Sequence, residues 1–316
     1  MMKKTIVMMF ALLLLAACGT DNTNALGTTP FIGGTQGIKM EFVDNFPPPR
    51  VSDGGEEQFD MIIRLTNKGE SDVAPEDVKV RLSGFSPHLF DVTASDLAKN
   101  SPELIERNIK NPDGSTIQSL PVEVEFGPFR YLQRVQGTQT FPVRAQICYT
   151  YNTFVASTVC VKEDFRNDNQ GDICRVASAR TAFNSAAPIQ VTEIRQSAAR
   201  QDTTRLVFTV TNRDQGDVYR RDSQCESEGR LEDRVYVKLT GLSADQGEVV
   251  NCRSLRTDAG SGGSEGYVIL NNEGRAEVSC DVSFNERTPR IQPFGLELSY
   301  KYSENIQRNI VVERSD

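Results

Sequence analysis

Apolar and polar residues alternate along most of the chain after Gly37, a pattern typical of strands with one buried face. The first strand carries Ile38, Met40 and Phe42 on one face, with charged residues between them. Further alternating runs follow at residues 59–65, 78–82, 122–126 and 143–151. The pattern therefore predicts an all-β chain.

The run at 143–151 is followed by a second apolar stretch, Val155 to Val161. We expect these two strands to pair as an antiparallel hairpin centred on Phe154. Cys148 and Cys160 are equally far from that centre, so they would lie opposite each other, at the separation that a cross-strand disulfide requires.

Two interruptions of the alternation have their own signals. Ser101-Pro102-Glu103 predicts the start of a short helix, because proline is tolerated in the first helical turn. Residues 164–187 are polar and irregular, and they predict a linker between one domain at 37–163 and another at 188–316.

The second half of the chain repeats the first. Three pairs of segments match in the same order: 59–67 with 204–212, 76–84 with 232–241, and 149–151 with 300–302. In the last pair Tyr-Thr-Tyr falls on Tyr-Lys-Tyr at an offset of 151. The repeat predicts a duplicated β-domain. Frequent turn signals between the strands predict that each copy folds as an antiparallel sandwich. We therefore expect two tandem antiparallel β-sandwich domains.

The cysteines predict a disulfide framework. Seven are present, and an odd number is unexpected in a secreted protein unless one has another role. Cys252 and Cys280 lie in apolar segments, whereas Cys174 and Cys225 lie in polar ones. The predicted bonds are therefore Cys148–Cys160, Cys252–Cys280 and Cys174–Cys225. No two cysteines have CxxC spacing, so we do not expect a zinc site.

The first eighteen residues predict the location of the protein. Lys3 and Lys4 precede a short apolar run, Thr5 to Leu15, which is typical of a secretory signal and too short to span a bilayer. The ending Leu15-Ala16-Ala17-Cys18 resembles the lipobox of prokaryotic lipoproteins. The resemblance implies that residues 1–17 are a signal peptide and that Cys18 becomes the lipidated N-terminus, which also explains the odd cysteine. An uncleaved anchor and ordinary signal cleavage remain as alternatives.

Residues 18–36 are rich in Gly, Thr and Asn and predict a flexible tether. The formal charge of −8 argues against nucleic acid and anionic membrane as partners. His88 is the single histidine and stands in a predicted loop, so any Ser-His-Asp or Cys-His mechanism must use it.

Two carboxylate groups are candidates for chemistry. Glu123 and Glu125 share one face of a predicted strand, where a carboxylate pair could act in acid–base catalysis or bind a metal ion. A solvated strand face is the preferred interpretation. In the linker, five oxygen-bearing side chains suit calcium, but their order does not match an EF-hand loop. A solvated acidic loop is preferred there. These five residues are Asp164, Asn167, Asp168, Asn169 and Asp172.

Two further segments have a functional and a structural interpretation. Gly260 to Ser264 is glycine-rich but lacks the following Lys-Ser/Thr of a phosphate-binding loop, so we expect a flexible loop. Phe126 to Tyr131 places aromatic residues beside Arg130, as in an interface hot spot. Core packing at a strand end is the preferred interpretation.

Arg64 to Gly69 and Asp77 to Leu82 resemble the immunoglobulin-like modules of prokaryotic surface proteins, including the cell-adhesion-related (CARDB) type. The order of Gly34-Thr35-Gln36-Gly37 and Cys148-Tyr149 is similar to that of two-domain lipoproteins of small-genome archaea. The resemblance implies an immunoglobulin-like fold, an exposed location and no defined chemistry.

We expect a lipid-anchored extracytoplasmic protein that binds, adheres or scaffolds, without catalysis and without a cofactor. Its expected partners are the membrane, through the N-terminal lipid, and an unidentified surface protein or glycan. The alternative is a ligand-binding or accessory subunit of an envelope assembly. A carboxylate-dependent hydrolase is a third hypothesis, disfavoured by the missing residue types.

Overall fold

A computed structural model describes residues 29–315 apart from 169–172, 226–230, 243–246 and 259. The described chain is all-β, as predicted, and apart from one short parallel pairing its strands pair antiparallel. It contains three short 3₁₀ helices, η1 (Pro75–Asp77), η2 (Pro87–Phe90) and η3 (Ala94–Leu97), and no α-helix within the described ranges. None of its helices is long and apolar enough to cross a membrane.

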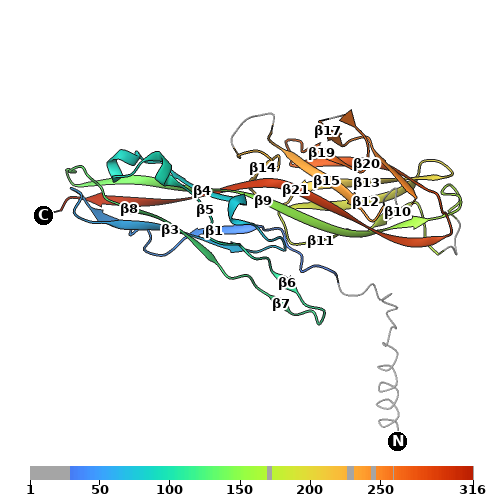
Figure 1. Ribbon diagram of the computed structural model, residues 1–316, viewed down its shortest axis with the longest axis horizontal. Helices are drawn as coiled ribbons and strands as arrows, with labels where there is room; N and C mark the ends of the chain where they lie inside the picture. The colour runs from blue at the N-terminus through green and yellow to red at the C-terminus, as the bar shows by residue number, and fades with distance from the viewer. Residues whose placement is uncertain (1–28, 169–172, 226–230, 243–246, 259, 316) are drawn as a thin grey trace, which may run out of the picture.

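Two smaller sheets lie against the two ends of one long sheet (Figure 1). The smaller sheets have three and five strands, and the alternating burial of their strands matches the predicted pattern. In order across each sheet they are β1 (Ile38–Phe42), β3 (Phe59–Asn67) and β8 (Val122–Phe129), and β10 (Ser178–Arg180), β12 (Ile189–Ala198), β13 (Thr203–Asn212), β20 (Arg275–Phe284) and β16 (Glu248–Cys252).

The long sheet is built on two strands of 24 residues each, β9 (Thr138–Val161) and β21 (Arg290–Glu313). They pair antiparallel along their whole length, from Thr138–Glu313 to Val161–Arg290. The rest of the sheet comprises β18 (Gly260–Ser261), β17 (Arg256–Thr257), β19 (Glu265–Ile269), β15 (Arg234–Thr240), β4 (Val78–Ser83) and β5 (Ala98–Asn100), with β11 (Phe183–Asn184) beside β9 and with β14 (Asp217–Tyr219) and β2 (Arg50–Ser52) beside β21.

The predicted hairpin centred on Phe154 is wrong. The chain continues straight through this residue, and odd-numbered positions stay buried from Phe141 to Val161. No glycine or proline interrupts residues 143–161, so the strongest signals for a turn are absent there. The partner of the strand is instead β21, which arrives from the other end of the sequence.

The long pair connects two lobes. We call the three-stranded sheet and the strands facing it the first lobe, and the five-stranded sheet and its facing strands the second lobe. The C-terminal part of β21 belongs to the first lobe, whereas the C-terminal part of β9 belongs to the second (Figure 1). The predicted boundary after residue 163 is therefore wrong, because two strands cross between the lobes.

Equivalent tyrosines on β9 and β21 bond to equivalent backbone groups in the two lobes. The N–H of Ile38 donates to Tyr149 Oη (3.2 Å), and the N–H of Ile189 donates to Tyr300 Oη (3.3 Å). Each pair of residues is separated by 111 positions. Thr150 and Lys301, which the offset of 151 relates, are themselves partners at the middle of the long pair.

A second pair of tyrosines repeats this relation. Tyr151 Oη donates to Asn67 Oδ1 (2.8 Å), and Tyr302 Oη donates to Asn212 Oδ1 (3.2 Å). Each asparagine also donates to the carbonyl four residues later, at 2.7 Å in the first lobe and 2.9 Å in the second. Burial raises the pKa of both tyrosines, so they remain neutral hydrogen-bonding groups.

The segment before β1 is held between the lobes, although a flexible tether was predicted up to residue 36. The N–H groups of Ile32 and Gly33 donate to the Glu70 carboxylate at 2.9 and 3.1 Å. The N–H of Ala186 donates to the same carboxylate (2.6 Å), and the carbonyl of Gly34 accepts from Ala187 (3.2 Å). Residues 1–28, which include the predicted signal peptide and Cys18, lie outside the described residues.

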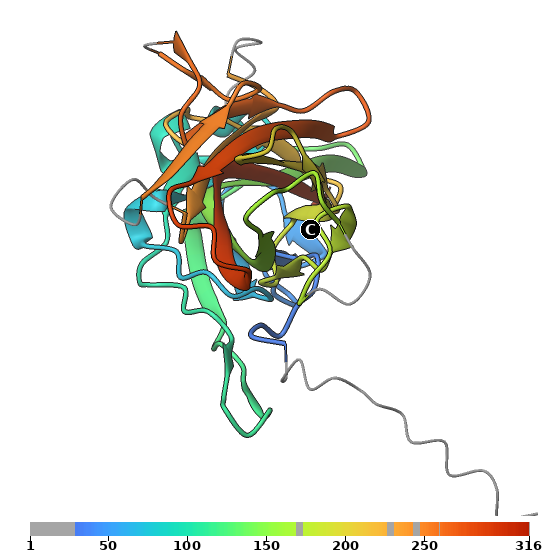
Figure 2. The same ribbon diagram turned by 90° about the vertical axis from the view of Figure 1, so that its right-hand side faces the viewer.

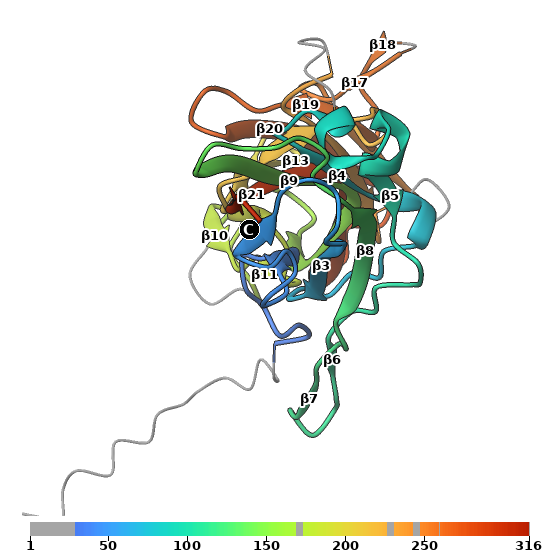
Figure 3. The same cartoon turned by 90° about the vertical axis from the view of Figure 1, so that its left-hand side faces the viewer.

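The region between β5 and β8 differs from its prediction. Residues 101–105 form no helix, and Ile105 instead makes an isolated bridge with Val73. The hairpin of β6 (Ile109–Lys110) and β7 (Thr116–Ile117) projects from the body (Figures 2 and 3). The hairpin is tied to the segment before β1, because Lys110 Nζ donates to the carbonyls of Thr29 and Phe31.

Candidate functional site

The outer face of the long sheet in the first lobe carries an exposed group of cations. Lys79 and Arg81 project from β4, and Arg144 projects from β9 beside Gln146. The register places Lys79 beside Cys148, Arg81 beside Gln146 and Ser83 beside Arg144. Since alternate residues of a strand face the same side, these side chains form one surface.

Amide side chains extend this surface across β21. Asn305, Gln307 and Asn309 are exposed and lie beside Gln146, Arg144 and Pro142 of β9. No outward position on β4, on β9 from Pro142 to Cys148, or on β21 from Ser303 to Asn309 carries a carboxylate. The outward side chains of these three strand segments are therefore cationic or neutral. We call Lys79, Arg81, Arg144, Gln146, Asn305 and Gln307 the basic face.

A disulfide and a covering segment form one wall of the basic face. Cys148 on β9 is bonded to Cys225, and the segment before Cys225 includes β14, which pairs with β21 from Lys301 to Ser303. Lys301 Nζ donates to the carbonyl of Ser223 (2.7 Å) and holds this segment down. A cavity of about 290 Å³ lies at the wall, lined by Lys79, Arg81, Gln146, Cys148, Tyr219, Gln224 and Cys225.

Two of the three predicted disulfides are wrong. The structure joins Cys148 to Cys225 and Cys160 to Cys174, not Cys148 to Cys160 and Cys174 to Cys225. The error follows from the predicted hairpin, because Cys148 and Cys160 lie twelve residues apart on one continuous strand. The third prediction is confirmed, since Cys252 and Cys280 are directly opposed on β16 and β20 and are bonded.

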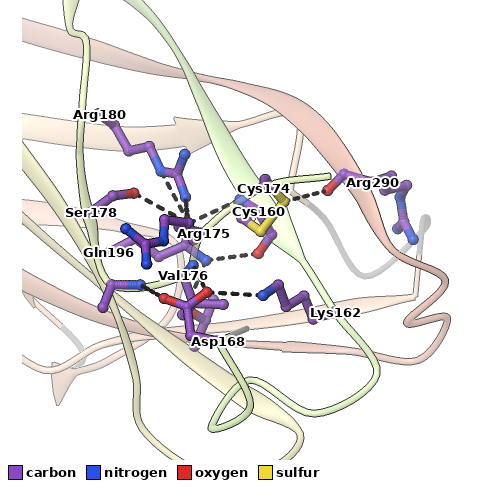
Figure 4. Close-up of a disulfide and its surroundings, with 12 residues drawn as sticks. Cys160, Lys162, Asp168, Cys174, Arg175, Val176, Ser178, Arg180, Gln196 and Arg290 are labelled. Carbon is purple, nitrogen blue, oxygen red and sulfur yellow. Dashed lines mark hydrogen bonds and ion pairs between the residues drawn. A yellow bond between two sulfur atoms is a disulfide. The ribbon is translucent and has the colours of Figure 1, made fainter. Parts of the chain in front are cut away.

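The Cys160–Cys174 bond closes the loop that was predicted to be a linker (Figure 4). Asp168 organises the described part of this loop, because its carboxylate accepts from Lys162 Nζ (2.9 Å) and from the N–H groups of Val176 and Ala177. The bond from Lys162, followed by these N–H groups, lowers the pKa of Asp168 to about 2. This carboxylate therefore has protein partners.

The calcium hypothesis concerned this same loop. Asn169 and Asp172 lie outside the described residues, and Asp164 accepts from the N–H of Arg166 (2.9 Å). Across the parts of the chain that the structure describes, no group of three or more His, Cys, Asp or Glu side chains is arranged to hold a metal ion.

The other candidate residues take structural positions. Phe126, Phe129 and Tyr131 are buried, which confirms core packing. Glu123 is exposed and pairs with Arg64 (2.7 Å), so it belongs to a solvated strand face. His88 is exposed in η2.

The glycine-rich segment Gly260 to Ser264 begins in β18, which pairs with β17. It is thus part of a small hairpin, whereas a flexible loop was predicted.

Sequence reasoning missed the basic face, although its signal is present. Lys79, Arg81 and Arg144 alternate with buried residues, so each strand reveals which residues face outward. What the sequence does not contain is the pairing of β9 with β21. That pairing alone brings the amides of residues 305–309 beside the cations.

Six cysteines in three disulfides indicate a protein of an oxidising compartment outside the cytoplasm. No protein-family model matches the chain, and no curated protein matches it.

Solved structures give only distant likenesses. The envelope protein VP37 from White Spot Syndrome Virus is 8% identical, with 49% of this chain and 98% of that chain covered and a TM-score of 0.18. The secreted serine protease VesC from Vibrio cholerae is 8% identical, with coverages of 84% and 50% and a TM-score of 0.17. A chain of Sulfolobus Turreted Icosahedral Virus is 9% identical, with coverages of 80% and 84% and a TM-score of 0.13. Such low TM-scores support no inference about fold or function.

Proposed function

We propose that this protein is a lipid-anchored extracytoplasmic binding module without catalytic activity, and that the basic face binds an acidic glycan. The anchor rests on the lipobox-like Leu15-Ala16-Ala17-Cys18. The location is supported by the three disulfides, and the binding role by the basic face.

The architecture that we propose is a duplicated immunoglobulin-like sandwich whose two copies have exchanged the C-terminal halves of their last strands, β9 and β21. The matched tyrosine bonds support the duplication, since Tyr149 and Tyr300 accept from equivalent N–H groups. The register of β4 on β9 supports it too. Val80 lies beside Ile147, and the residues at the matching offsets, Val237 and Leu298, lie beside each other on β15 and β21.

The chemistry of the basic face favours an acidic glycan over a protein. Protein interfaces depend on aromatic and other apolar anchors at their centre, and the basic face has none. Its ammonium, guanidinium and amide groups instead suit carboxylate or sulfate groups and hydroxyls. The single observation that carries the proposal is that the register of β4, β9 and β21 brings their cations and amides together on one outward face.

Binding to alginate, a uronic acid polymer, tests the glycan proposal, with neutral dextran as the comparison. We expect alginate binding that weakens as salt rises, and a loss of about tenfold in the Lys79→Gln/Arg144→Gln variant. Arg195→Gln is the matched control, because it removes a cation from β12 in the second lobe. Equal binding of both polymers, or equal loss in both variants, contradicts the proposal.

The anchor is tested separately in cells that make the full chain. Replacing Cys18 by Ser should move the protein from the membrane fraction to the soluble fraction, because the acylated residue is lost. Tight membrane attachment of the Cys18→Ser variant would refute a lipid anchor at this position.

A further inference from the structure

One edge of β21 is open in the middle of an otherwise paired strand. On the side away from β9, β15 pairs with Gly295 to Ser299, β14 pairs with Lys301 to Ser303, and β2 pairs with Val311 to Glu313. Among the described residues, no strand pairs with residues 304–310 on this side.

The open edge presents backbone hydrogen-bonding groups to the outside. The N–H of Val311 donates to the carbonyl of Pro49 (3.1 Å) in the β2 region, so Val311 points its backbone groups away from β9. Backbone direction alternates along a strand. Asn305, Gln307 and Asn309 therefore point their N–H and C=O groups toward the same open side.

The internal repeat allows the open edge of β21 to be compared with the equivalent edge of β9, which is covered. The offset of 151 relates Glu304, Ile306 and Arg308 of β21 to Thr153, Val155 and Ser157 of β9. The β9 residues are 0%, 4% and 7% exposed, whereas all three β21 residues are only half-buried although they face inward.

A short strand accounts for the difference. β11 pairs antiparallel with β9 at Val155 and Ala156 and covers this edge in the second lobe. The chain adds hydrogen bonds beyond the strand, because the N–H of Ser185 donates to the carbonyl of Phe154 (2.8 Å). In the first lobe, the segment at the matching offset contacts Glu70 at the junction of the lobes instead.

Two cavities mark the ends of the open edge, and their charges differ. At one end a cavity of about 290 Å³ is lined by Asp214, Asp217 and Glu304, among others. At the other end a cavity of about 500 Å³ is lined by Arg308, Asn309 and the segment from Asp44 to Pro49. Arg308 reaches the carbonyl of Val43 (3.0 Å) and lies 3.9 Å from the Asp44 carboxylate.

We propose that residues 304–310 of β21 accept an extended segment of a partner protein, which adds to the sheet as an antiparallel strand. The register of β11 on β9 defines the expected pairing, centred on Ile306 and Gln307. Strand addition to an exposed edge is an established mode of peptide recognition, with backbone bonds giving affinity and alternate side chains giving specificity. The edge shares Asn305 and Gln307 with the basic face, but it uses their backbone groups whereas the basic face uses their side chains.

The residues of the open edge specify the sequence of the added strand. In an antiparallel pair, the residue opposite Ile306 faces inward and is apolar, because Ile306 packs against the core. Two positions later the added strand meets Glu304, near Asp214, and carries Lys or Arg. Two positions earlier it meets Arg308 and carries Asp or Glu. The partner segment thus reads acidic, apolar and basic at alternate positions.

A blocked peptide of sequence Thr-Asp-Thr-Val-Thr-Lys-Thr tests the proposal on the whole mature chain at pH 8, where Glu304 is ionised although burial raises its pKa to about 7. We expect saturable binding, and slower amide hydrogen exchange at residues 305, 307 and 309 when the peptide is present. A peptide with Asp and Lys exchanged should bind about tenfold more weakly, because like charges then face each other at both ends.

Two variants assign the binding to this edge. Gln307→Pro removes an N–H that faces the open side, so the fold should persist while the edge is blocked. Glu304→Gln should weaken binding of the peptide Thr-Asp-Thr-Val-Thr-Lys-Thr, because its Lys then loses the opposite charge. The variant should not weaken binding of the analogue in which this Lys is replaced by Gln. Arg195→Gln is the control, and circular dichroism checks folding of each variant.

The proposal is overturned if the two peptides bind equally, or if exchange slows elsewhere but not at residues 305–309. Full binding by a folded Gln307→Pro variant also overturns it. None of these outcomes bears on alginate binding, so failure here is distinguishable from failure of the glycan proposal.

Discussion

Glu304 of β21 allows a quantitative test of the environment at the open edge, through the pH dependence of the free energy of unfolding. Its carboxyl faces inward between Tyr302 and Ile306 and is half-buried. Burial, with a smaller contribution from the charge of Asp214, raises the pKa of Glu304 from 4.5 to about 7. Because the folded chain resists ionisation of this group, replacing it by Gln should stabilise the protein at high pH.

The sign and the size follow from proton binding. Between pH 4.5 and 7 the folded chain keeps a proton on Glu304 that the unfolded chain has lost, so stability falls as pH rises through this window. The two pKa values differ by about 2.5, which at about 1.36 kcal/mol for each pH unit gives at most about 3.4 kcal/mol. Solvent contact screens the carboxylate, so we expect about 1–2 kcal/mol.

Urea unfolding at pH 4, 6 and 8 measures this effect, followed by far-ultraviolet circular dichroism because the chain has no tryptophan. At pH 4 both Glu304 and Gln are neutral, so Glu304→Gln and the parent should unfold at similar urea concentrations. At pH 8 the variant should be more stable by about 1–2 kcal/mol.

Two matched variants control the experiment. Asp214→Asn removes the nearby charge and should stabilise the protein at pH 8 by a smaller amount. Glu125→Gln changes an exposed carboxylate on β8, so its effect on stability should be small. A Glu304→Gln effect that is the same at both pH values, or a destabilisation confined to pH 8, would refute the reasoning.

Three other predictions concern the ties within the fold. Breaking the Cys148–Cys225 bond with a double serine variant should lower the free energy of unfolding by about 4 kcal/mol, as expected for a loop of this length, and non-reducing peptide mapping should recover this pair. Tyr151→Phe should cost about 0.5–1.5 kcal/mol in urea unfolding, because Asn67 Oδ1 loses one of its two donors and keeps the N–H of Gly69. Asp53→Asn should speed amide exchange at Ser315, whose N–H donates to Asp53 (3.0 Å). Bonds from that N–H and others lower the pKa of Asp53, so its stabilisation should be present above pH 3.8 and be lost as pH falls further.

The strands of the protein were largely readable from the sequence. Alternation correctly located β1, β3, β4 and β8, because each has one buried and one solvated face. It failed at Phe154, where a polar and aromatic stretch was interpreted as a turn. In the structure the odd-numbered positions from 141 onward stay buried through β9, but Thr153 and Ser157 are polar, so the apolar alternation in the sequence is broken there.

The candidate sites were less readable for a physical reason. A disulfide or a binding face depends on which strands are neighbours, and β9 finds its neighbour about 150 positions away. Local spacing therefore suggested Cys148–Cys160, whereas the covering segment of the second lobe brings Cys225 to Cys148. Cys252–Cys280 was found because both cysteines lie on strands of one lobe.

The long pair of β9 and β21 also fixes an order of events in folding. During synthesis, β9 is complete well before β21 exists, so the first lobe lacks the strand that finishes its sheet until the last residues of β21 arrive. Contacts between positions so far apart in sequence close slowly. The two lobes are thus expected to become stable together, in one late step, and a chain halted before β21 should remain open along β9 and prone to association through that edge.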